Sequence, residues 1–536
     1  MSPRIAPPRR DGLRSVTAEP EWVVVAFGGL LLLALGLRLA LITSWFGEID
    51  SDEAVVGLMA LQIPHELPAF YWEQHYAGSL ESIAAAYAFA AFGPSATSLK
   101  LVPAAFSVAY IGLVFISARA AFGWPVALIS AAYLAIPPSF FAVWSVKARG
   151  GYAEMLALGH LFLVLCQRAT MAGGAGPVLL GTIGVVGGLA VWTHPVAAVY
   201  LVTGAILAAG TAYRERVPGR RIAAATAVVL LGLAVGCSPA IVHLVREGAG
   251  TFSSAAEAGV APRAAVLNLW GLTRYGAPVL VGLAEGTASK TMLDEDWPQR
   301  LGSIPAVTVA LLLVVLLATW SQWRAIPALF RRGGGVRERA AAPFLVLLLA
   351  IPPFVAVSRF AELWAEPRYA LPVYSAVPLF VAAALSLASR ARWLGWGAIG
   401  AAFLLNLWSL ATSDPRLSLP TNAGESTRAN RQELIRHLAQ QNQTRIYTDY
   451  WLAYPIAFES SERIIPSVWS GGFNRRAAYA HQVAQTANPT FVFARDTRGD
   501  QQFRALLQAT DGRADVARVG VYHVYSNVTP LVVMRP

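Results

Sequence analysis

The sequence has little charge, little cysteine and very little lysine. Charged residues make up 14% of the chain, whereas about 25% is usual for a soluble domain, so an ordinary water-soluble globule is excluded. Both cysteines, Cys166 and Cys237, fall inside apolar segments, so we expect no disulfide framework. The sequence also contains no glycine-rich phosphate loop and no metal-type spacing of histidine and cysteine. These absences exclude the common nucleotide-binding and zinc-binding classes.

Long hydrophobic segments are abundant instead. Hydrophobic residues account for 56% of the 536 residues, and the mean hydropathy is +0.50. A helix that spans a membrane needs about 20 apolar residues. We therefore predict a polytopic α-helical membrane protein with about eleven transmembrane helices and a small C-terminal soluble α/β domain. The predicted spans are roughly 22–46, 99–118, 124–143, 151–167, 177–192, 195–212, 222–244, 302–321, 343–357, 370–388 and 393–412.

The basic residues orient these spans. If the N-terminus is cytoplasmic, the inner segments hold more arginine and lysine than the outer loops, in agreement with the positive-inside rule. The net charge of +11 then needs no nucleic-acid partner, and an odd number of crossings places the C-terminal domain in the periplasm or outside the cell. Nearly all of the 42 basic residues are arginines, which favours a bacterial inner membrane.

Composition divides the chain into three regions. Inside the first outer loop, residues 54–62 and 78–92 are amphipathic and are expected to lie as helices on the membrane surface. After residue 412, helical and strand patterns alternate, which is typical of a small α/β domain. The predicted regions are a basic cytoplasmic tail (1–20), a transmembrane domain (21–412) with long outer loops at 47–98 and 245–300, and an extracytoplasmic α/β domain (413–536).

The first outer loop is strongly acidic. It has no lysine or arginine between Phe46 and Ser98, and it begins with Asp50, Asp52 and Glu53. Carboxylates that are partly buried at a membrane surface cost solvation energy, so they are either well solvated or held for a function. Asp50 and Glu53 also have the spacing of a capping box at a helix start. Two interpretations therefore remain: a helix cap alone, or a base or metal ligand at Asp50 or Asp52.

Two other outer turns carry charge next to predicted spans. Charged residues at membrane depth usually line a cavity. Carboxylates suit a base that activates a hydroxyl, and the arginine fork suits a phosphate. The residues concerned are Lys147, Arg149 and Glu154 in one turn and Arg368 and Tyr369 in the other.

Each of these residues has a structural alternative. Lys147 and Arg149 are also compatible with snorkelling to the surface, Glu154 with pairing to Arg149, and Arg368 with pairing to a nearby glutamate. Arg38, inside the first span, is expected to snorkel or to pair with an inner acid.

Three further residues are considered for substrate contact. His194 is expected to be a satisfied core histidine. Glu73 and His75 lie beside Tyr71 and Trp72, where an aromatic belt at the membrane interface is the simpler explanation.

Taken in order, these features resemble the GT-C superfamily of polyprenyl-phosphate-sugar-dependent glycosyltransferases. The likeness is to the branch with the protein O-mannosyltransferases and the lipid A aminoarabinose transferase, and it covers about residues 1–412. The residues that carry it are the pair Asp52-Glu53 soon after the first helix, the aromatic turn Tyr71-Trp72-Glu73-Gln74 followed by Phe92-Gly93, and Arg368-Tyr369-Ala370-Leu371-Pro372 at a late outer helix start.

The resemblance implies a hexosyl- or pentosyltransferase, with inversion at the sugar, on the extracytoplasmic face. Its partners would be a polyprenyl-phosphate-linked sugar, membrane lipids and an acceptor glycan, lipid or protein. Asp52 would be the catalytic base. Asp50-Ser51-Asp52 has the Asp-x-Asp form that is used for metals in the oligosaccharyltransferase branch, so a divalent cation on Asp50 and Asp52 is an alternative, and no other cofactor is expected. The implied site residues are Asp52, Glu53 and Asp50 for catalysis, Arg368, Tyr369, Lys147 and Arg149 for the donor phosphate, and Glu154, Glu73 and His75 for orienting the substrate.

Two other functions remain open. A secondary transporter or a flippase of lipid-linked sugars would use intramembrane acids, although the acids here cluster at one face and we see no repeated halves. A polymerase or ligase of surface glycans would use related chemistry with diphosphate-linked donors.

Overall fold

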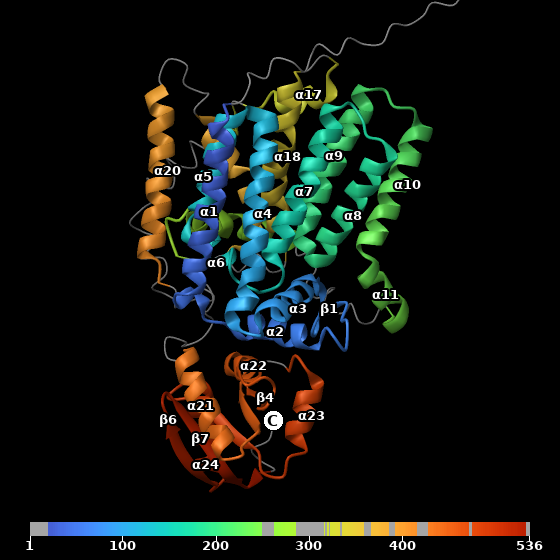
Figure 1. Ribbon diagram of the computed structural model, residues 1–536. Helices are drawn as coiled ribbons and strands as arrows, with labels where there is room; N and C mark the ends of the chain where they lie inside the picture. The colour runs from blue at the N-terminus through green and yellow to red at the C-terminus, as the bar shows by residue number, and fades with distance from the viewer. Residues whose placement is uncertain are drawn as a thin grey trace, which may run out of the picture.

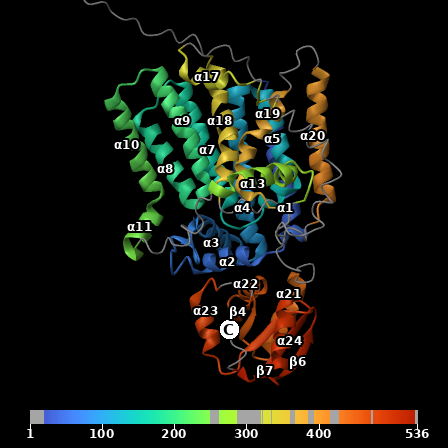
Figure 2. The same cartoon turned by 180° about the vertical axis from the view of Figure 1, so that it is seen from behind.

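The computed structural model forms a helical bundle, a thin middle layer and a C-terminal α/β unit, stacked in that order in both views (Figures 1 and 2). The two short helices of the middle layer lie across the end of the bundle. The structure describes residues 20–248, 262–285, 316, 319–320, 322–332, 335–358, 366–384, 392–414, 427–470 and 474–531.

The bundle is made of apolar helices, and the chain is an integral membrane protein. Among the described residues, six helices are long and apolar enough to cross a membrane by length and composition. Most of the predicted span 302–321 lies outside the described residues, so the count of eleven crossings stays a prediction. The six are α1 (Trp22–Ile42), α4 (Ala96–Phe122), η3 with α9 (Pro195–Ala197 and Ala198–Arg214), α10 (Gly219–Gly236), α18 (Val336–Ala356) and α20 (Arg392–Thr412).

Shorter helices complete the bundle. Two predicted spans are each divided where proline, which has no N–H to donate, prevents a continuous helix: 124–143 at Pro137 and Pro138, and 222–244 just before Pro239. The other helices, all but α7 shorter than those six, are α5 (Trp124–Ala135), α6 (Ser139–Trp144), α7 (Tyr152–Met171), α8 (Pro177–Thr193), α11 (Ser238–Glu247), α13 (Ala265–Gly271), α14 (Ala277–Leu280), α17 (Ala325–Phe330), α19 (Val377–Ala383), the 3-10 helices η2 (Trp45–Gly47), η5 (Pro262–Ala264) and η7 (Arg368–Ser375), and the π-helix η6 (Leu272–Gly276).

Helices α8 and α10 pack through facing glycines. A Cβ atom added to Gly188 would lie 2.2 Å from the carbonyl oxygen of Leu233, and one added to Gly236 would lie 2.2 Å from that of Val185. Small residues at such a contact let two membrane helices approach until their backbones touch.

The middle layer consists of α2 (Ser51–Gln62), the hairpin β1 (Phe70–Tyr71) and β2 (Gln74–Gly78), and α3 (Leu80–Phe92). The two helices that the sequence predicts for this loop are thus confirmed. Val55 and Met59 of α2 are buried in the same hydrophobic cluster as Tyr454 and Phe458 of the C-terminal unit. Because they share a core, the middle layer is fixed to that unit as well as to the bundle.

The C-terminal unit has one five-stranded sheet in the order β4-β3-β5-β7-β6. Strand β3 pairs in parallel with β4 and β5, whereas β7 runs antiparallel to β5 and β6. The predicted alternation of helices and strands is confirmed, but α22 and β4 were not predicted. The elements are α21 (Arg428–Gln440), β3 (Arg445–Asp449), α22 (Tyr450–Glu459), β4 (Ile465–Ser470), α23 (Ala477–Ala484), β5 (Thr490–Ala494), α24 (Arg498–Ala509), β6 (Arg513–Val519) and β7 (Tyr522–Thr529).

Candidate active site

Asp50 and Asp52 lie at the start of α2, beneath the bundle. Asp50 is the N-cap: its Oδ1 accepts a hydrogen bond from the Glu53 N–H at 2.9 Å, and Oε2 of Glu53 accepts one from the Asp50 N–H at 3.3 Å. The capping box that the spacing indicates is therefore present. It uses one oxygen of Asp50 and does not involve the Asp52 carboxylate.

The other oxygen of Asp50 faces two cations from the turn between α6 and α7. Lys147 Nζ lies 3.1 Å and Arg149 Nη1 lies 3.5 Å from Asp50 Oδ2. Burial alone would raise the pKa of Asp50, but the charges of Lys147 and Arg149 outweigh burial and hold this pKa below its ordinary value. Both basic side chains are largely buried, so they turn inward to the acids instead of snorkelling.

Asp52 joins three segments that are far apart in the sequence. Its Oδ2 lies 2.9 Å from Arg149 Nε. Its Oδ1 accepts a hydrogen bond from the Tyr450 hydroxyl at 2.5 Å and lies 3.4 Å from Arg475 Nη2. The Tyr71 hydroxyl donates to the backbone carbonyl of Asp52 at 3.0 Å. The bundle thus supplies a cation to one carboxylate oxygen, and the C-terminal unit supplies a cation and a hydroxyl to the other.

The start of η7 brings the third charged turn to the same place. Glu366 Oε1 lies 3.8 Å from Arg149 Nη1, and its Oε2 lies 3.6 Å from Arg368 Nη1. The Arg368 guanidinium lies 5.5 Å from the centroid of the Tyr369 ring. The expected pairing of Arg368 with a nearby glutamate is therefore present, and Glu366 connects Arg368 to Arg149. The three turns that the sequence singled out form one continuous set of charges.

Glu53 lies in a different environment from its neighbours. It is 1% exposed. Its Oε1 accepts hydrogen bonds from Lys100 Nζ and, at 2.9 Å, from the N–H of Ala148. A buried ion pair of this kind holds structure in place, because loss of one partner leaves an uncompensated charge. Glu53 thus connects α2 to α4 and to the turn that carries Lys147, and its catalytic role stays a prediction.

Glu154 lies beside a second acid. It is fully buried in the first turn of α7, and the contacts described for Arg149 are with other carboxylates. Glu81 of α3 accepts a hydrogen bond from the Gly151 N–H at 2.9 Å. Gly151 has a φ of +68°, which glycine adopts without strain. Burial raises the pKa of Glu81, and the nearby Glu154 charge adds to this rise.

Two predicted substrate contacts remain, Glu73 and His75, together with His194, which was expected to be a core histidine and whose ring centroid lies 6.2 Å from that of Tyr369. Glu73 is exposed at the tip of the β1–β2 hairpin, with a φ of +57°. His75 stacks on His243 of α11, with ring centroids 5.4 Å apart. The orienting roles of Glu73 and His75 stay predictions, since the contacts described for them do not include Asp50 or Asp52. His194 is buried and accepts a hydrogen bond from the Val196 N–H at 3.2 Å, as expected of a core histidine.

Sequence reasoning missed Lys100, Tyr450 and Arg475. Lys100 lies inside an apolar helix, and a lysine at such a position could have been recognised as a candidate for the site. Tyr450 and Arg475 carry no local motif, because they meet Asp52 from 398 and 423 residues along the chain. Only the packing of the C-terminal unit under α2 brings them to the site.

The arrangement does not fit a divalent cation on Asp50 and Asp52. Their oxygens are already paired with Lys147, Arg149 and Arg475, which neutralise the charge that a hard cation requires. Within the described part of the chain, no group of three or more histidine, cysteine, aspartate or glutamate side chains is placed to hold a metal ion. We therefore derive no chemical step from a metal.

Comparison with known proteins gives structural matches only. No protein-family model and no curated protein matches the sequence. ArnT from Cupriavidus metallidurans bound to undecaprenyl phosphate has a TM-score of 0.57 at 13% identity, covering 95% of this chain and 98% of that one. Apo ArnT gives a TM-score of 0.56 at 12% identity, with coverages of 96% and 99%. Archaeal oligosaccharyltransferase AglB from Archaeoglobus fulgidus, with an inhibitory peptide and a dolichol-phosphate, gives 0.51 at 13% identity, with coverages of 95% and 74%.

At such low identity the likeness is one of fold. It extends over nearly the whole chain, including the C-terminal unit, and the two structures contain undecaprenyl phosphate and a dolichol-phosphate. The resemblance predicted from the first outer loop and the late arginine turn is thus confirmed in the architecture: this chain has the fold of ArnT and AglB.

Proposed function

We propose that the protein is a membrane glycosyltransferase that moves a sugar from a polyprenyl-phosphate donor to an acceptor hydroxyl on the extracytoplasmic face. The observation that carries the proposal is the set of charges around Asp52. Two carboxylates stand beside Lys147 and Arg149, and Glu366 links these to Arg368. This set combines a base with phosphate-binding groups.

In the proposed reaction Asp52 is the general base. The acceptor hydroxyl approaches Asp52 and gives up its proton to the carboxylate while its oxygen bonds to C1 of the sugar. The bond between C1 and the phosphate oxygen breaks, its electron pair stays on the polyprenyl phosphate, and attack from the opposite side inverts C1. Lys147, Arg149 and Arg368 stabilise the negative charge that develops on the leaving phosphate, which is usually the largest contribution to catalysis.

Asp50 has a supporting role in this proposal. Its ionised carboxylate holds Lys147 Nζ at 3.1 Å, so the cation stays beside the phosphate position without a bound donor. Preorganised charge of this kind needs no rearrangement during the reaction. Glu81 of α3 and Glu154 of α7 are left for contacts to the sugar or the acceptor.

The transporter alternative is not favoured. A transporter places its ion and substrate sites near the bilayer midplane. Here the acids and cations gather where the bundle meets the middle layer, and the C-terminal unit contacts Asp52 directly.

The test is turnover by the detergent-purified full-length protein. It would be incubated with a panel of polyprenyl-phosphate sugars, with and without EDTA, and release of polyprenyl phosphate followed. We expect release by the wild type in both conditions and a loss of at least about 100-fold in Asp52→Asn. The matched control is Glu66→Gln, which changes an exposed acid of the same loop and should retain the wild-type rate.

A near-normal rate in a folded Asp52→Asn protein contradicts the role of Asp52. If no donor in the panel yields polyprenyl phosphate, the proposed function is contradicted.

A further inference from the structure

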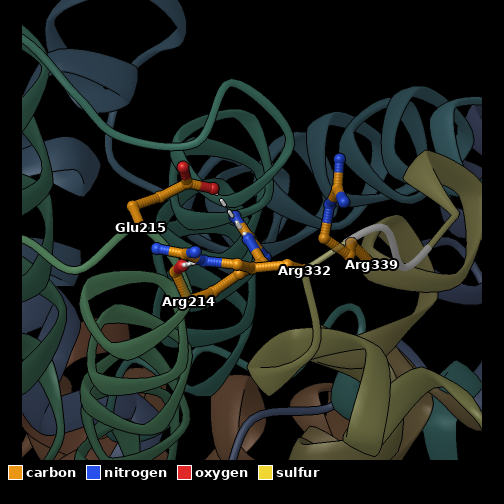
Figure 3. Close-up of a pocket in the computed structure, with 4 residues that line it drawn as sticks. All are labelled: Arg214, Glu215, Arg332 and Arg339. Carbon is orange, nitrogen blue, oxygen red and sulfur yellow. Dashed lines mark hydrogen bonds and ion pairs between the residues drawn. The ribbon is translucent and has the colours of Figure 1, made fainter.

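A polar cavity lies beside α17, at the end of the bundle farthest from the C-terminal unit (Figure 1). Its volume is about 290 Å³, and it is lined by Arg214, Glu215, Arg332 and Arg339. A single water needs only about 10–15 Å³, so the cavity has room for a larger group. Arg214 is the last residue of α9, Arg332 follows α17, and Arg339 lies near the start of α18. Figure 3 shows the four side chains, with Arg339 to one side of the other three.

The cavity carries excess positive charge on a fixed framework. The side chain of Arg214 is 3% exposed. Its guanidinium donates to Glu215 Oε1 at 2.8 Å and to the carbonyl oxygens of Thr170 and Leu329 at 3.2 and 3.4 Å. Arg332 Nε donates to the Arg214 carbonyl oxygen at 3.4 Å. Three arginines and one glutamate thus line one hollow, and a bound anion would offset the excess positive charge.

An exposed aromatic pair adjoins this cavity. Tyr213 is 72% exposed and Phe330 is 41% exposed, and their ring centroids lie 6.2 Å apart. Tyr213 directly precedes Arg214, and Phe330 lies two residues before Arg332. Aromatic rings of this kind occupy the headgroup level at the ends of membrane helices. An anion that reaches the cavity along these rings would carry an apolar part as well as a charge.

We propose that this cavity binds the phosphate group of an anionic membrane lipid. The arginine fork matches phosphate oxygens, and basic pockets between membrane helices bind lipid headgroups. The phosphate would lie between Arg332 and Arg339, over the fixed guanidinium of Arg214, and the acyl chains would leave along Tyr213 and Phe330. This binding does not depend on the proposed transfer reaction. The cavity lies beside α17 and Asp52 lies in α2, and Figure 1 shows these two helices at opposite ends of the bundle.

The test is native mass spectrometry of the full-length protein titrated with phosphatidylglycerol or with phosphatidylcholine. We expect the wild type to bind phosphatidylglycerol more tightly, and Arg332→Ala to weaken that binding about tenfold, or about 1.4 kcal/mol. Arg331→Ala is the matched control, since it removes an adjacent exposed arginine that does not line the cavity. It should change the affinity less than twofold. Arg339→Gln is the second variant if Arg332→Ala does not fold.

Two outcomes would overturn the proposal. Equal weakening by Arg332→Ala and Arg331→Ala would mean that general surface charge, and not this cavity, attracts the lipid. The second outcome comes from a competition experiment, in which inorganic phosphate is added to the protein with bound phosphatidylglycerol. If phosphate displaces phosphatidylglycerol at equal concentration, and does so through Arg332, the cavity is a site for free phosphate and the lipid assignment is wrong.

Discussion

Arg38 shows how a buried charge in the bundle is satisfied. It was expected to snorkel or to pair with an acid, but it is fully buried, and its guanidinium donates to the carbonyl oxygens of Leu134 and Ala135 at 2.8 and 2.9 Å. These are the last carbonyls of α5, which have no partner within their own helix. Arg38 therefore caps α5, and that expectation was wrong because the acceptors lie nearly 100 residues away in the sequence.

Glu81 presents the opposite case, a buried acid beside another acid. Its burial and the Glu154 and Glu53 charges raise its pKa above the ordinary 4.5, against the lowering effects of the Gly151 N–H and Lys100. At a pH between the ordinary pKa and the raised pKa, Glu81 of the folded protein keeps a proton that Glu81 of the unfolded chain has released. The free energy of unfolding therefore falls as the pH rises through this range. Glu81→Gln removes the titration and keeps an oxygen acceptor for Gly151. We expect the thermal midpoint of the wild type to fall more than that of the variant between about pH 5 and about pH 8.

The measurement is thermal unfolding in one detergent across that pH range. Glu66→Gln again serves as the control, because Glu66 is exposed and its replacement should leave the wild-type pH dependence unchanged. Parallel curves for the wild type and Glu81→Gln would mean that Glu81 does not carry a raised pKa.

Between elements, the contact of α8 with α10 depends on the absence of side chains. A Cβ at Gly188 would lie 2.2 Å from the Leu233 carbonyl oxygen, so any larger residue must push the helices apart. We expect Gly188→Ile to destabilise the protein by about 1–3 kcal/mol, measured as a lower thermal midpoint. Gly29→Ile on α1 is the matched control, since a Cβ there meets nothing within 4 Å. Equal midpoints for the two variants would contradict the close packing.

The helices were largely predictable because hydrophobic segments of sufficient length indicate membrane spans directly. The divisions of two spans lie next to prolines that were visible in the sequence, but α18 continues through Pro352 and Pro353, so proline alone did not predict where a span divides. Helix α22 and strand β4 were missed for a different reason. Residues 450–459 form a short apolar segment, which does not by itself distinguish helix from strand, and the N-cap that starts the helix, Asp449, is also the last residue of β3. Strand β4 is defined by its parallel pairing with β3, which no local pattern records.

For the whole molecule, the site was only partly predictable. Asp50, Asp52, Lys147, Arg149 and Arg368 were expected to converge because each lies in an outer turn next to a span, and the structure brings them together. The contribution of the C-terminal unit was not foreseen. Its residues reach the site through a hydrophobic core shared with α2, and no motif in the sequence indicates that contact.

That contact makes the C-terminal unit part of the proposed site. The side chain of Arg475 is 4% exposed, and it bridges Asp52 Oδ1 at 3.4 Å and the Tyr450 hydroxyl at 2.8 Å. It therefore fixes the direction of the proposed base, and a misplaced base costs about 100-fold in rate.

We expect Arg475→Ala to lower kcat by about that factor with little change in the KM for the donor, and Arg475→Lys to recover part of the loss. Arg476→Ala is the control, because Arg476 lies over the Trp72 ring instead. An increase in kcat would mean that Arg475 restrains Asp52 in a closed state, and an effect confined to the donor KM would place Arg475 on the phosphate.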